Sequence, residues 1–70
     1  MIFEAVQYLD SDFPNEILFG ILDTDTNELY PMTSAQSAIE CAREMNNGRL
    51  FSFGAFPSFL MLTISEIKTL

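Results

Sequence analysis

The chain has 70 residues, with 10 acidic and three basic side chains, one cysteine, no histidine and a formal net charge of -7. This length predicts one domain, residues 1–70. The charge argues against binding nucleic acid or anionic membranes directly, and the lone Cys41 can form neither an intrachain disulfide nor a zinc site.

Residues 2–9 lack a helix cap and are rich in strand-forming residues, so they predict a first strand, which we place near a sheet edge. Alternation would put Val6 and Tyr8 on one face of the sheet and Phe3 and Ala5 on the other.

Turn-forming residues and Pro14 predict a loop at residues 10–15. Residues 16–22 then predict a second strand, which is apolar on both faces and is therefore expected to be central. Gly20 within it indicates either a bulge or a close approach by the helix.

The segment 23–27, Asp-Thr-Asp-Thr-Asn, is typical of a hairpin turn. It also looks like the start of a calcium loop, but Glu28 stands where that loop needs glycine and Ser34 where it needs glutamate. We therefore favour the plain turn. A short third strand at 28–30 should follow and end at Pro31.

A capping box of Thr33 and Gln36 predicts the start of a helix at residues 34–47, and Asn47-Gly48 predicts its end. Apolar residues recur at helical spacing and should face a sheet closely, because most are alanine. These residues are Ala35, Ala38, Ile39, Ala42 and Met45. Cys41 is expected to be a small buried residue of the same helix.

Residues 49–54 and 58–67 predict two further strands around a turn at 55–57. The order β-β-β-α-β-β predicts an α+β fold, a small two-layer domain. Its antiparallel or mixed sheet of four to five strands would carry one helix packed on one face. The opposite face would then need water or a partner.

No group in the chain predicts catalysis, a metal or a cofactor. Cys41 has no histidine to act as its base, the paired carboxylates fall in hydrated turns, and no glycine-rich phosphate loop is present. The apolar run 50–64 is too short and interrupted to span a membrane. Without a signal peptide and with a free thiol, we expect a cytoplasmic protein, in a bacterial or host cell.

The acidic residues have an unusual distribution, because seven carboxylates lie within residues 1–28 and the first basic residue is Arg43. They are either a solubilising surface or a rim that imitates the phosphates of a nucleic acid. The candidate partner-binding acids are Asp10, Asp12, Glu16, Asp23, Asp25 and Glu28.

We therefore predict a small acidic inhibitor, encoded by a phage or mobile element, that blocks a basic nucleic-acid-binding surface of a larger host protein. Anti-CRISPR proteins and transcription inhibitors are examples of this type, although no motif here matches a family. The alternative is a homodimeric structural or adaptor module without enzymatic activity, associating through the uncovered sheet face or an edge strand. The candidate apolar contacts for either function are Phe51, Phe53, Phe56 and Phe59, which could equally belong to the core.

Overall fold

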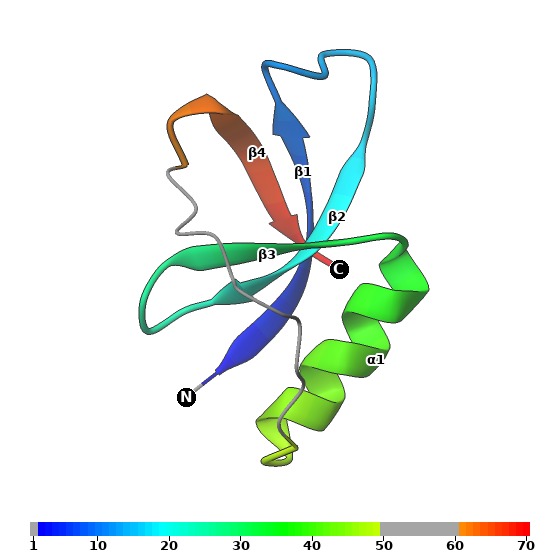
Figure 1. The fold of residues 1–70 in the computed structure, drawn as a ribbon, viewed down its shortest axis with the longest axis vertical. Helices are drawn as coiled ribbons and strands as arrows, with labels where there is room; N and C mark the ends of the chain where they lie inside the picture. Colours follow the sequence, from blue (N-terminus) through cyan, green and yellow to red (C-terminus); the bar gives the residue numbers. More distant parts are fainter. Residues whose placement is uncertain (1, 50–60) are drawn as a thin grey trace.

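The computed structural model describes residues 2–49 and 61–70. The elements run β1 (Phe3–Asp10), β2 (Leu18–Asp23), β3 (Glu28–Met32), α1 (Ala35–Asn46), a short 3₁₀ turn η1 (Met61–Thr63) and β4 (Ile64–Thr69) (Figure 1). The four strands form one open antiparallel sheet in the order β3-β2-β1-β4. The chain is therefore a small α+β fold, as its sequence predicts.

The structure differs from the predictions in the position of β1, which was expected near a sheet edge, and in the bounds of β3 and β4. β2 is central as expected, but β1 is also an inner strand, between β2 and β4. β3 continues through Pro31 because it is an edge strand, where a residue without an N–H costs least. Of the strand predicted at 58–67, the first three residues lie outside the described residues, Met61–Thr63 form η1, and the strand β4 runs from Ile64 to Thr69. The strand predicted at 49–54 lies almost wholly outside the described residues.

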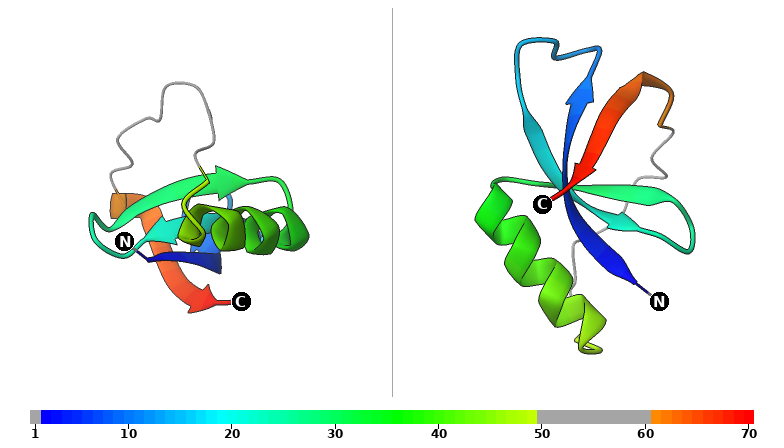
Figure 2. Two further views of the ribbon diagram at one scale, coloured as in Figure 1. Left: turned by 90° about the horizontal axis from the view of Figure 1, so that it is seen from below. Right: turned by 180° about the vertical axis from the view of Figure 1, so that it is seen from behind.

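One face of the sheet packs against α1, around the fully buried Ile21 of β2. Ala38 and Ala42 of the helix are buried against it, and Phe3 and Ala5 of β1 pack at its margin. Alanine carries only a methyl group, so the helix approaches the strands closely. Figure 2 shows the helix lying along one side of the sheet. Ile39, predicted in the apolar stripe, is instead 39% exposed.

The face opposite the helix is also buried, contrary to the expectation that it needs water or a partner. Val6 and Leu29 are 0% and 1% exposed there. Ile64 and Ile67 of β4 pack against this cluster although they are three residues apart. A register shift against β1 and a positive φ of 51° at Glu66 bring both side chains to the same face.

Gly20 lies on this second face and has no room for a side chain. A Cβ there would approach the Tyr30 carbonyl oxygen to 2.8 Å and side-chain atoms of Leu29 and Tyr8 to 3.1 and 3.2 Å. The close approach expected at Gly20 therefore comes from the neighbouring strands and not from the helix.

The helix begins one residue later than its predicted capping box. Ser34 is the N-cap, and its Oγ accepts a hydrogen bond from the Ser37 N–H at 3.1 Å. At the other end Gly48 has a φ of 89°, and the Arg49 N–H donates to the Glu44 carbonyl at 3.0 Å. The predicted Asn47-Gly48 stop is thus confirmed as a left-handed helix end.

Candidate partner-binding surface

The candidate acidic residues lie around two loops at opposite ends of β2. The loop 11–17 joins β1 to β2, and the turn 24–27 joins β2 to β3 (Figure 1). The fold therefore separates the acids into two groups. The 11–17 loop and the C-terminal end of α1 lie at opposite ends of the molecule's long axis (Figures 1 and 2).

Two of the six candidate acids are buried and organise these loops from within. Asp10 and Asp23 are only 9% and 4% exposed. The Oδ1 of Asp10 accepts a hydrogen bond from the Asp12 N–H at 3.0 Å, and the Oδ1 of Asp23 accepts one from the Asp25 N–H at 2.9 Å. Each is the first residue of an Asx turn. The repeated Asp-x-Asp pattern at the end of a predicted strand was the sequence signal for this role.

The loop 11–17 combines acidic and apolar side chains on the surface. Asp12 and Glu16 are exposed, and no described basic residue forms an ion pair with either. Phe13 is 53% exposed and Ile17 is 61% exposed. Neither apolar residue was predicted to be a contact, although a phenylalanine before proline in a polar loop was a usable signal.

Hydrogen bonds fix the backbone of this loop at both ends. The Ser11 N–H donates to the Thr63 carbonyl at 2.9 Å, the Phe13 N–H to the Asp10 carbonyl at 2.9 Å, and the Glu16 N–H to the Phe13 carbonyl at 3.1 Å. The exposed side chains of the loop are therefore presented on an organised backbone, which lowers the entropy cost of binding.

The turn 24–27 is entirely polar, and its closing hydrogen bond runs from the Asn27 N–H to the Asp23 carbonyl at 2.7 Å. This geometry confirms the predicted hairpin turn. Beside it, Glu28 is half-buried and its Oε2 accepts a hydrogen bond from the Tyr30 hydroxyl at 2.9 Å. Burial, this hydrogen bond, and the charges of Glu28 and Asp23 raise the pKa of Tyr30 to about 12. Glu28 is thus already engaged within the fold.

A hollow of about 300 Å³ opens beside the 11–17 loop. It is lined by Tyr8, Asp10, Phe13, Glu16, Leu18, Pro31 and Met32. Two carboxylates therefore border an otherwise largely apolar wall, and the described lining contains no basic residue.

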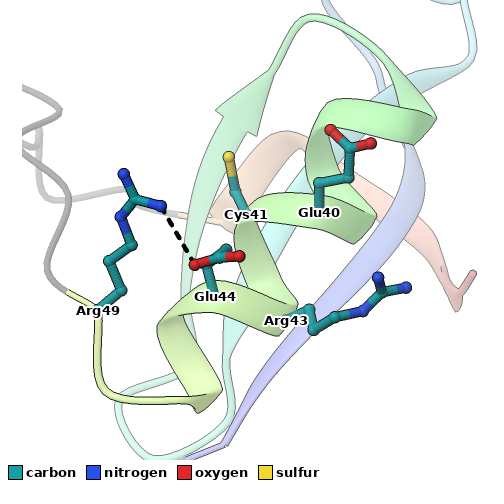
Figure 3. Close-up of a pocket in the computed structure, with 5 residues that line it drawn as sticks. All are labelled: Glu40, Cys41, Arg43, Glu44 and Arg49. Carbon is teal, nitrogen blue, oxygen red and sulfur yellow. Dashed lines mark hydrogen bonds and ion pairs between the residues drawn. The ribbon is translucent and has the colours of Figure 1, made fainter.

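A second, larger hollow of about 400 Å³ lies on the helix (Figure 3). It is lined by Glu40, Cys41, Arg43, Glu44 and Arg49. The two acids and two bases cancel in formal charge, and Arg49 pairs with Glu44 at 3.3 Å, while Arg43 points away from that pair. Cys41 packs against the core but is half-buried, so it is less buried than predicted. Because its lining is neutral overall, this hollow favours no charge in a ligand, whereas the hollow beside the 11–17 loop favours a positive one.

The predicted apolar contacts Phe51, Phe53, Phe56 and Phe59 lie outside the described residues. Within residues 2–49 and 61–70, no group of three potential ligand side chains could hold a metal ion. No helix in the same ranges is long and apolar enough to cross a membrane.

Comparison of the chain with protein-family models, curated proteins and solved structures found no match.

Proposed function

We propose that this chain is a small acidic protein that binds a basic surface of a larger protein and competes there with nucleic acid. The observation that supports this best is the 11–17 loop, where Asp12 and Glu16 stand beside exposed Phe13 and Ile17 on an organised backbone. Interfaces commonly combine an apolar anchor with charges that set orientation and partner choice. A phage or mobile-element inhibitor of a host nucleic-acid-binding protein fits this surface, and an anti-CRISPR protein is one example.

The two acidic loops have unequal parts in this proposal. The 11–17 loop supplies both charge and apolar contact, whereas the 24–27 turn supplies polar atoms and charge only. Their separation along β2 lets them meet two basic patches on a partner. We expect the 11–17 loop to contribute most of the affinity and Asp25 to contribute mainly to the association rate.

The homodimer alternative has weaker support among the described residues, and its candidate phenylalanine contacts lie outside them. The sheet face opposite α1 is filled, with Val6 0% exposed. Both sheet edges also carry features that oppose strand pairing, namely Pro31 on β3 and the bulge with charged Glu66 and Lys68 on β4. We therefore rank partner binding above self-association.

The test is capture of binding proteins from a bacterial lysate on the tagged chain, with elution by stepwise salt and identification by mass spectrometry. Each purified captured protein is then bound to a fluorescent DNA or RNA, and the chain is titrated in. The proposal expects displacement of the nucleic acid that weakens as NaCl rises from about 0.1 M to about 0.5 M, because salt screens the charges.

The acids to substitute in this test are exposed ones that do not organise a turn. Asp10 and Asp23 accept hydrogen bonds from backbone N–H groups in their turns, so substituting them could weaken binding by disturbing the fold. The double variant Asp12→Asn and Glu16→Gln removes two exposed charges from the 11–17 loop, and Glu40→Gln with Glu66→Gln removes the same number of exposed charges elsewhere. Loss of displacement in the first variant alone supports the proposal. Displacement that persists in the first variant, or a chain that displaces nucleic acid from no captured protein, contradicts it.

A further inference from the structure

The hollow beside the 11–17 loop has the size of a site for one side chain. Its volume of about 300 Å³ is at the lower end of the range of about 300–1,000 Å³ found for sites of whole small molecules. Its walls come from β1, β2, β3 and the loop between β1 and β2. Phe13, Leu18 and Met32 give it apolar surface, and Asp10 and Glu16 give it negative charge.

Tyr8 is the first sign that this hollow is built to hold a polar group. Its side chain lines the hollow and is only 4% exposed, yet its hydroxyl makes no hydrogen bond with a described residue. No fully enclosed side-chain polar atom of the described residues lacks a partner, so this hydroxyl must reach the solvent. Tyr8 and Asp10 are two residues apart on β1, so their side chains point to the same face of the sheet, and both line the hollow. Burial and then the charge of Asp10 raise the pKa of Tyr8.

Asp10 is the second sign, because it is nine-tenths buried and only half of its carboxylate is used. One oxygen accepts the Asp12 N–H at 3.0 Å, and the other accepts no hydrogen bond from a described residue. Since no fully enclosed polar atom of the described residues lacks a partner, this second oxygen is open to the hollow, where a positively charged donor could bond to it. Glu16 adds a second negative charge at the rim.

An arginine side chain matches this arrangement better than other ligands. Its guanidinium offers five N–H donors and accepts no hydrogen bond, which suits the acceptors of Tyr8, Asp10 and Glu16. Its methylene groups can pack on Phe13, Leu18 and Met32. A phosphate or carboxylate would be repelled by the two acids, and an apolar ligand would leave them desolvated without a partner.

We infer that the hollow between the 11–17 loop and β3 is a pocket for an arginine side chain of the partner protein. This inference rests on the proposed function, because it assigns the partner's anchor residue to the same acidic loop. The nucleic-acid-binding surface of the partner would lose that arginine to the pocket, and the exposed Phe13 and Ile17 would contact the surface around it.

The test uses N-acetyl-arginine amide as the probe and N-acetyl-citrulline amide as its uncharged control, titrated into the isotope-labelled full chain by NMR. Arginine should shift backbone signals of the 11–17 loop and of its neighbours Asp10, Leu18 and Met32, whereas citrulline should bind about tenfold more weakly. Glu16→Gln, an exposed change that cannot disturb the core, should weaken arginine about two- to fivefold. Asp10→Asn keeps an acceptor for the Asp12 N–H and should weaken it about tenfold.

The matched control is Asp25→Asn, which removes the same charge from the other loop and should leave arginine binding unchanged. Equal binding of arginine and citrulline, equal effects of Glu16→Gln and Asp25→Asn, or signals that shift around both loops alike would overturn the pocket. Tighter binding of N-acetyl-lysine amide than of the arginine probe would overturn the choice of arginine. The probe needs no partner protein, so a failed pocket with successful displacement of nucleic acid would refute this inference alone. A selective pocket without any displacement would refute only the inhibitor function.

Discussion

The side-chain amide of Asn46, in the last turn of α1, forms two hydrogen bonds with the backbone of Phe3 at the start of β1. The Phe3 N–H donates to the Asn46 Oδ1 at 2.7 Å, and the Asn46 Nδ2 donates to the Phe3 carbonyl at 2.8 Å. β4 pairs with β1 from Val6 onward, and the Leu70 N–H reaches only the Ala5 carbonyl. Asn46 therefore satisfies the edge of β1 beyond the point where its neighbouring strand ends.

Replacing Asn46 should loosen the junction between the helix and the sheet. Asn46→Ala removes both hydrogen bonds and should lower the free energy of unfolding by about 1 kcal/mol, since both groups are exposed and water replaces part of the loss. Asn46→Asp should cost at least as much, because a carboxylate cannot donate to the Phe3 carbonyl. Urea unfolding measures both. The control is Asn47→Ala, because the Asn47 side chain forms no hydrogen bond with a described residue. An equal loss of unfolding free energy in this control would contradict the role of Asn46.

The helix N-cap gives a second prediction, at the position where the structure departs from the predicted capping box. Ser34→Ala should cost about 1 kcal/mol of unfolding free energy, because the Ser37 N–H loses its acceptor. Thr33→Ala should change stability by a few tenths of that value, since Thr33 is exposed and precedes the cap. Thermal unfolding of the two variants side by side decides the cap: a larger loss at Thr33 would restore the original prediction.

Gly20 and Gly48 are needed for different reasons, which substitutions can separate. Gly20→Ala should cost about 1–3 kcal/mol, because the new methyl group meets the Tyr30 carbonyl oxygen at 2.8 Å and backbone cannot move aside cheaply. Gly48→Ala meets no atom within 4 Å but is strained by its φ of 89°, at a cost of about 1 kcal/mol.

Asparagine distinguishes these two mechanisms. It adopts left-handed backbone more readily than alanine, so Gly48→Asn should recover part of the lost stability, whereas Gly20→Asn should be worse than Gly20→Ala. Denaturant midpoints of the four variants measure this. If asparagine helped at Gly20, the steric explanation would fail.

The parts of the fold that rest on local patterns were predictable. The helix, the hairpin turn at 24–27 and the opposite faces of Val6 and Phe3 follow from spacing and turn chemistry, and the structure has all of them. The inner position of β1 was not predictable, because it depends on which strand pairs on its second edge. The bulge at Glu66 was missed for a related reason: strict alternation cannot place Ile64 and Ile67 on one face.

The candidate site was predictable in charge but not in arrangement. In the sequence, Asp10 and Asp12 are equivalent acidic residues. In the structure, Asp10 is buried and accepts a hydrogen bond that organises the loop, whereas Asp12 is an exposed charge. The hollow needs side chains from three strands and one loop, and no sequence spacing brings Glu16 beside Met32.

Alkaline pH should destabilise the fold through its two tyrosines. Burial together with nearby Glu28 and Asp23 raises the pKa of Tyr30 to about 12, and burial with Asp10 raises the pKa of Tyr8. The phenolate forms are thus disfavoured in the folded state. Their stabilising effect is fully present below the unfolded tyrosine pKa of about 10 and is lost as the pH rises through the folded values.

Denaturant midpoints measured from about pH 9 to about pH 12 should therefore fall, with phenolate absorbance of the native protein appearing only toward the upper end of that range. Tyr30→Phe should flatten the decline, although it lowers stability at neutral pH by removing the bond to Glu28. A native absorbance titration centred at about pH 10 for both tyrosines would contradict this account.

The last prediction separates the two roles assigned to Asp10, which are to fix the loop backbone and to supply charge. Asp10→Ala leaves the Asp12 N–H without its acceptor and should cost about 1–3 kcal/mol of unfolding free energy, because the site is largely buried. Asp10→Asn retains an acceptor oxygen at the same place and should cost clearly less. Hydrogen exchange of the Asp12 amide should accelerate in the alanine variant and stay near the native rate in the asparagine variant. Because only Asp10→Asn removes charge while keeping the turn, its effect on binding reports the carboxylate itself; equal exchange rates in the two variants would mean that the side chain of Asp10 does not organise the loop.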